Sequence, residues 1–109
     1  KHVVIPSKIG KKDVIKINDN AFINNDKIES IQINYGIETI GNKAFYDCDN
    51  LKEIVLPASL KNVGNSPAFE ECNNLTLLIY SGKISEKKLL GDDYQIKMLN
   101  LEIKKSSNE

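Results

Sequence analysis

Residues 28–50 read IESIQINYGIETIGNKAFYDCDN, and residues 51–74 read LKEIVLPASLKNVGNSPAFEECNN. Apolar residues recur at matching places in both stretches, and a glycine, an Ala-Phe pair and a cysteine follow in the same order. The second stretch is longer by one residue, which falls at Ser66-Pro67. A repeat of this length is typical of a solenoid, in which each repeat buries its apolar face against its neighbours.

A weaker copy of the pattern precedes residue 28. Val3–Ile5 followed by Pro6 aligns with Ile54–Leu56 followed by Pro57, and the pair Ala21-Phe22 falls where the later Ala-Phe pairs fall. Residues 7–13 contain extra residues, which we expect to form a hairpin-like surface loop, because repeat arrays accept insertions in their loops. The chain is therefore predicted to be a single domain, 1–109, with coils at about 3–27, 28–50 and 51–74 and a partial coil at 75–81.

The pattern stops after Ser81-Gly82. Ser85 is a helix N-cap residue and Gly91 a helix C-terminal residue, so residues 85–90 are predicted to be helical. Residues 94–103 alternate between apolar and polar, which predicts a final strand. We expect residues 82–103 to form a C-terminal cap over the last coil, and residues 104–109 to form a frayed tail.

The predicted fold is α/β: a right-handed solenoid of short parallel strands connected by short helical or 3-10 turns. These turns are expected at residues 20–24, 43–48 and 68–72, with Phe22, Phe45 and Phe69 at equivalent places in the interior. Gly41 and Gly64 are expected to bend the backbone by adopting positive φ angles.

Cys48 and Cys72 occupy the same place in consecutive coils. Paired strands lie about 4.7–4.9 Å apart, so a disulfide between them is geometrically conceivable. Free cysteines are among the most buried residues and pack as small hydrophobic side chains. We therefore favour two buried thiols.

Composition and charge exclude several classes of function. Fifteen basic residues balance fifteen acidic ones, so no electrostatic argument favours nucleic acid or an anionic membrane. The longest apolar run, Leu75–Tyr80, is far shorter than the roughly 20 residues that cross a membrane. His2 is the only histidine, and the cysteines lack C-x-x-C spacing. We expect no catalytic, metal-binding or cofactor-binding residue.

The outward face of the predicted strands is the candidate binding face, because alternate strand residues point away from the core. Contiguous apolar area that remains exposed often marks a contact surface. There are two alternatives. Either β-branched residues occur at these positions only because they favour β-strands, or the C-terminal cap covers the residues. The candidate binding face comprises Val4, Ser30, Gln32, Glu53, Val55, Leu77 and Ile79.

The order Leu51-x-x-Ile54-x-Leu56-Pro57-x-x-Leu60-x-x-Val63-Gly64, followed by Ala68-Phe69-x-x-Cys72, resembles the BspA-type leucine-rich repeat. The chain departs from that pattern at Asn34, where proline is usual, at Asn25, where cysteine is usual, and at Pro67, which interrupts a coil. The resemblance implies a protein that is secreted or displayed on the surface of host-associated bacteria and binds host, extracellular-matrix or other surface proteins in adhesion; such arrays also occur in some anaerobic protists. It implies recognition rather than catalysis, and it supplies no fixed binding motif. The alternatives are a structural spacer or terminal unit of a larger surface protein, and a self-associating module.

Overall fold

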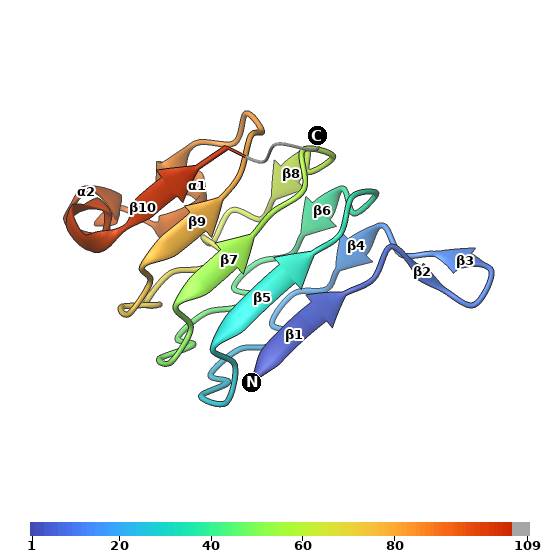
Figure 1. Ribbon diagram of the computed structural model, residues 1–109, viewed down its shortest axis with the longest axis horizontal. Helices are drawn as coiled ribbons and strands as arrows, with labels where there is room; N and C mark the ends of the chain where they lie inside the picture. Colours follow the sequence, from blue (N-terminus) through green and yellow to red (C-terminus); the bar gives the residue numbers. More distant parts are fainter. Residues whose placement is uncertain (106–109) are drawn as a thin grey trace.

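The computed structural model describes residues 1–105 of the 109-residue chain, and short parallel strands dominate it (Figure 1). The larger sheet of this described part has five strands, each paired in parallel with the next. Because neighbours in the sheet come from successive repeats, the order follows the sequence. The strands are β1 (His2–Ile5), β5 (Ser30–Ile33), β7 (Glu53–Val55), β9 (Leu77–Ile79) and β10 (Glu102–Lys104).

A second parallel sheet runs beside the first and comes from the second half of each coil. Its order is β4 (Lys16–Ile17), β6 (Thr39–Ile40) and β8 (Asn62–Val63). The insertion in the first coil forms the expected hairpin, in which β2 (Lys8–Ile9) pairs antiparallel with β3 (Lys12–Asp13).

Equivalent apolar residues of successive coils lie next to one another in the larger sheet. Ile31 pairs with Ile54, and Ile54 with Leu78, and all three are buried. The phenylalanine rings repeat this order in the interior: the centroids of Phe22 and Phe45 are 5.1 Å apart, and those of Phe45 and Phe69 are 5.0 Å apart. Phe45 and Phe69 are fully buried. The prediction that the three rings occupy equivalent interior places is confirmed.

The connections after the second strand of each coil are turns rather than the expected helical segments. Their backbone hydrogen bonds span three residues, as from the Ala44 N–H to the Gly41 carbonyl and from the Tyr46 N–H to the Lys43 carbonyl. Lys43 and Asp47 have φ angles of 53° and 55°. Residues in this left-handed region interrupt a right-handed helix, so the coil turns sharply instead of continuing as one.

Gly41 and Gly64 are required for close packing, and the expectation of positive φ angles there is wrong. A Cβ atom at Gly41 would lie 2.7 Å from the Asn18 carbonyl carbon, and one at Gly64 would lie 2.7 Å from the Asn42 backbone nitrogen. Successive coils approach too closely at this corner for any side chain.

The C-terminal segment begins as predicted and then differs. Helix α1 (Glu86–Leu90) has Ser85 as N-cap, whose Oγ accepts from the Lys88 N–H, and ends at Gly91. Residues 94–103 form helix α2 (Tyr94–Lys97), the 3-10 helix η1 (Met98–Asn100) and the start of β10, so the single strand expected there is wrong.

The spacing of the apolar residues explains this difference. Tyr94 and Met98 are partly buried and Leu101 is buried, at intervals of four and three residues, whereas Ile96 and Leu99 are 69% and 81% exposed. That spacing is helical. Lys104, expected in a frayed tail, is the last residue of β10, and residues 106–109 of that expected tail lie outside the described residues. No helix in the described part is long and apolar enough to cross a membrane.

Candidate binding surface

The outward side chains of the five-stranded sheet form two parallel rows, which we call the sheet face. The register places Val4 beside Gln32, Gln32 beside Val55, and Val55 beside Ile79. The second row follows the same order through Ser30, Glu53 and Leu77. All seven residues proposed from the sequence therefore lie together on this face: Val4, Ser30, Gln32, Glu53, Val55, Leu77 and Ile79.

The apolar residues of the sheet face are less exposed than the alternation of strand residues suggests. Val4 on the outer strand is 46% exposed, whereas Val55, Leu77 and Ile79 are partly buried. Each of these three has a neighbouring strand on both sides, and the neighbouring side chains shield it. Gln32 and Glu53 are exposed, so the C-terminal segment does not cover the rows; β10 extends the sheet at its edge instead (Figure 1).

Three members of the rows were missed from the sequence. His2 begins the second row beside Ser30, and its Nδ1 forms a hydrogen bond with the Ser30 Oγ. Glu102 and Lys104 end the two rows beside Leu77 and Ile79. Glu102 and Lys104 were not predicted as part of the face, because the parallel pairing of β10 with β9 depends on the helices over residues 94–100, and a single strand was expected there.

Ion pairing occurs at the start of the strands, next to the sheet face. The N-terminal ammonium of Lys1 lies 2.6 Å from the Glu29 Oε1. Its hydrogen bond and its charge hold the pKa of Glu29 below the usual value, and Lys52 contributes less. Both Lys1 and Glu29 are exposed, so the pair contributes little to stability.

The two cysteines are buried free thiols, as favoured from the sequence. The Cys48 thiol donates to the Phe22 carbonyl at 3.3 Å, and the Cys72 thiol donates to the Phe45 carbonyl at 3.0 Å. The pKa of the Cys72 thiol is raised well above its ordinary value, because its interaction with the Cys48 sulfur and its burial both disfavour the thiolate. Neither thiol is placed to react with a ligand at the surface.

The turn after β6 gathers acidic side chains. The pKa of Asp47 is raised, first by a hydrogen bond with Asp49, then by partial desolvation and by the charges of Asp49 and Glu71. Among residues 1–105, no group of three or more histidine, cysteine, aspartate or glutamate side chains has a geometry that could hold a metal ion.

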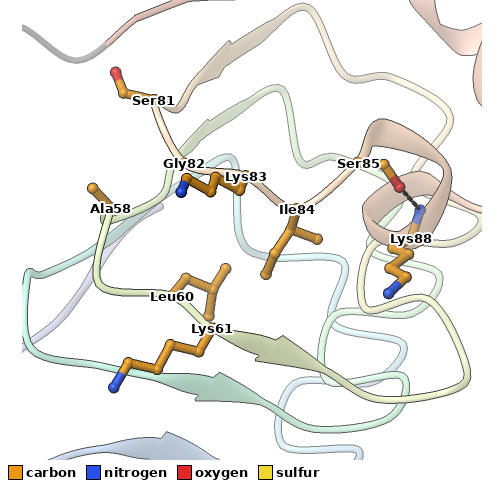
Figure 2. A pocket seen from close by; sticks show the side chains of 9 residues that line it. All are labelled: Ala58, Leu60, Lys61, Ser81, Gly82, Lys83, Ile84, Ser85 and Lys88. Atoms are coloured by element: carbon orange, nitrogen blue, oxygen red, sulfur yellow. Dashed lines mark hydrogen bonds between the residues drawn. The ribbon is translucent and has the colours of Figure 1, made fainter.

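A groove of about 620 Å³ lies between residues 58–61, which lead into β8, and residues 81–88 (Figure 2), and none of its lining residues belongs to the sheet face. Leu60 and Ile84 provide apolar lining, and three lysines, Lys61, Lys83 and Lys88, also line it. A second hollow of about 510 Å³ continues it past Val63 and shares Ser85 and Lys88. Sequence reasoning missed this groove, because it depends on how residues 81–85 lie beside β8.

Residues 2–105 match the family described as BspA type Leucine rich repeat region (6 copies). No curated protein and no solved structure shows significant similarity to the chain.

Proposed function

The chain belongs to the BspA-type leucine-rich repeat family, and from this premise we propose that it is a non-enzymatic module that binds proteins at a bacterial cell surface. The partner would be a host or extracellular-matrix protein or another surface protein, and the role would be adhesion. Bacterial origin and a secreted, extracellular or cell-surface location are part of the proposal and follow from the family. In this proposal the coils form a right-handed solenoid that the C-terminal segment caps.

The sheet face is the observation that carries the proposal. Five parallel strands align two rows of side chains, and these rows combine apolar residues with exposed polar ones such as Gln32 and Glu53. A row of this kind offers apolar contact area together with hydrogen-bonding groups, which is the usual composition of a protein–protein interface. The aligned sheets of repeat proteins commonly supply such binding surfaces.

Replacing Val55 and Ile79 together with lysine tests the proposal. The two residues are neighbours in one row, so the change places two adjacent charges in the centre of the face. Because both are only partly buried, the lysine stems can lie along the sheet while the ammonium groups reach water. We expect at least a tenfold loss of affinity for immobilised matrix or host proteins in a surface-binding assay, with the circular dichroism spectrum unchanged.

The matched control replaces Ile9 and Ile15, which are 69% and 57% exposed and lie outside the sheet face, with lysine. This control adds the same charge and should bind as the original protein does. Equal loss in both variants would contradict a role for the sheet face. A protein that binds no partner in either form would instead be a structural spacer, and self-association in sedimentation experiments would identify the third alternative.

A further inference from the structure

The second sheet ends at β8, whereas the larger sheet continues beyond it to β9 and β10. The first three coils each contribute one strand to the second sheet, namely β4, β6 and β8. Residues 81–85, which follow β9, lead into α1 and form no strand of the second sheet (Figure 2). The groove and the neighbouring hollow therefore lie next to the unpaired edge of β8, where a fourth strand of this sheet would otherwise stand; the groove reaches Lys61 just before β8, and the hollow reaches Val63 within it.

The backbone of β8 shows which groups face this groove. The Asn62 and Gly64 N–H groups both donate, at 3.1 Å, to the Glu38 and Ile40 carbonyls of the preceding coil. Alternate residues of a parallel strand direct their backbone groups to opposite sides. The carbonyl of Lys61 and both backbone groups of Val63 therefore point away from β6, on the side of the groove and the neighbouring hollow, and within residues 1–105 no backbone hydrogen bond to them is found.

The charge beside this edge is predominantly positive: four lysines line the groove and the hollow, against two acidic residues. Lys61, Lys83 and Lys88 are exposed and line the groove, and among the described residues no acidic side chain lines this part of it. Lys61 lies 3.6 Å from Glu38 in an exposed pair, which water screens. Within the described chain Lys83 and Lys88 form no ion pair. Glu70 and Asp92 line only the neighbouring hollow.

We propose that the groove along β8 binds an extended acidic segment of a partner protein, which adds to the edge of β8 as a further strand. The segment's backbone would bond to Lys61 and Val63, an apolar side chain would pack on Leu60 and Ile84, and its carboxylates would face the three lysines. Strand addition is an established mode of peptide recognition in which backbone bonds give affinity and alternate side chains give specificity. Complementary charge favours the encounter and selects the partner.

This groove is separate from the sheet face, so either surface can fail its test without the other. The probe is a fluorescein-labelled peptide, Glu-Val-Glu-Val-Glu-Val, with both ends blocked, and its anisotropy reports binding to the full chain. We expect saturable binding that weakens at least tenfold in the variant Lys83→Glu with Lys88→Glu. The control Lys11→Glu with Lys12→Glu makes the same charge change in the hairpin loop and should alter affinity by less than about twofold.

Amide chemical shifts in a nuclear magnetic resonance titration should change at Lys61, Val63 and Ile84 and not in the hairpin. A peptide methylated at alternate backbone nitrogens keeps its carboxylates but loses strand pairing, and it should bind at least tenfold more weakly. The proposal is overturned if the acidic peptide does not bind, if both charge-reversed variants lose affinity equally, or if the methylated peptide binds as well as its parent. Equal binding of a sulfated oligosaccharide and the methylated peptide would identify a simple anion site instead.

Discussion

Gly64 shows how a single residue limits the distance between coils. The side chain of Asn42 lies over it, and the Oδ1 of Asn42 accepts a hydrogen bond at 3.1 Å from the Ser66 N–H of the next coil. One coil earlier, the Oδ1 of Asp19 accepts from the Asn42 N–H at 2.8 Å, above Gly41. The glycine and the polar side chain therefore act as a pair: the missing Cβ leaves the space in which the polar group connects two coils.

Gly64→Ala should destabilise the protein by about 1–3 kcal/mol, because the added methyl group must displace Asn42 and strain the packed corner. The measurement is the free energy of unfolding in urea. The control is Asn65→Ala at the neighbouring exposed position, which should change stability by less than about 0.5 kcal/mol. Equal stability of Gly64→Ala and the original protein would contradict the packing role.

The turns show where residue identities limit prediction. Asn20, Asn24, Lys43, Asp47 and Glu71 all have positive φ angles. Asparagine tolerates that region, but lysine and glutamate do not indicate it. The sequence accordingly predicted where each turn lies and what it buries, but a helical turn was expected where the backbone visits the left-handed region.

At the scale of elements, the stacked phenylalanine rings form the centre of the coils. The ring planes of Phe22 and Phe45, and of Phe45 and Phe69, are inclined by only 4°. Backbone hydrogen bonds follow the same order: the Phe22 N–H donates to the Ala44 carbonyl at 2.7 Å, and the Phe45 N–H donates to the Ala68 carbonyl at 2.9 Å. Because ring and backbone share one register, each Ala-Phe pair fixes its coil against the next.

Phe45→Ala should cost about 3–5 kcal/mol of unfolding free energy, because a fully buried ring with a ring on each side leaves a cavity. Phe22→Ala should cost clearly less, since Phe22 is only partly buried and stacks on one ring. Urea denaturation of the two variants gives the comparison. Equal losses of unfolding free energy in the two variants would show that burial and the number of neighbouring rings do not determine how much each phenylalanine contributes.

The elements of the repeats were predictable and the C-terminal elements only in part. The apolar positions of 28–50 and 51–74 gave the parallel strands and their register, because each inward residue has one equivalent partner a coil away. Residues 94–103 contain two overlapping apolar patterns, one alternating and one helical. Only packing against the last coil, which the sequence does not display, selects the helical one.

At the scale of the whole molecule, the first three coils pair with one another in both parallel sheets, and the fourth pairs only in the larger sheet. The molecule is elongated, with extents of 41 × 29 × 27 Å. The sheet face could be predicted from strand alternation alone, and its seven residues do lie together. The groove along β8 could not, because it arises from a strand that the second sheet lacks.

The two buried thiols make the free energy of unfolding depend on pH. Folding raises the pKa of Cys72, so the folded protein keeps a proton that the unfolded chain loses above about pH 8.5. Through Cys72, stability therefore falls as pH rises above about 8.5, by about 1.4 kcal/mol per pH unit for one thiol. The pKa of Cys48 is lowered, first by its interaction with Cys72, so below about pH 8.5 Cys48 contributes in the opposite direction. Unfolding free energies from pH 7 to 10 should show this decline, and a Cys72→Ala variant should show a shallower one. Parallel profiles would exclude Cys72 as the cause.

The Phe69 N–H donates to the carbonyl of Leu89 in α1 at 3.0 Å, the bond that its equivalents make to the next Ala-Phe pair. A main-chain carbonyl demands no particular side chain from the donor, so this bond alone selects no residue in the coil. The selection comes from Leu89 and Leu90, both 1% exposed in the core, and grafting the segment that carries them onto another repeat would therefore require a matching apolar surface there.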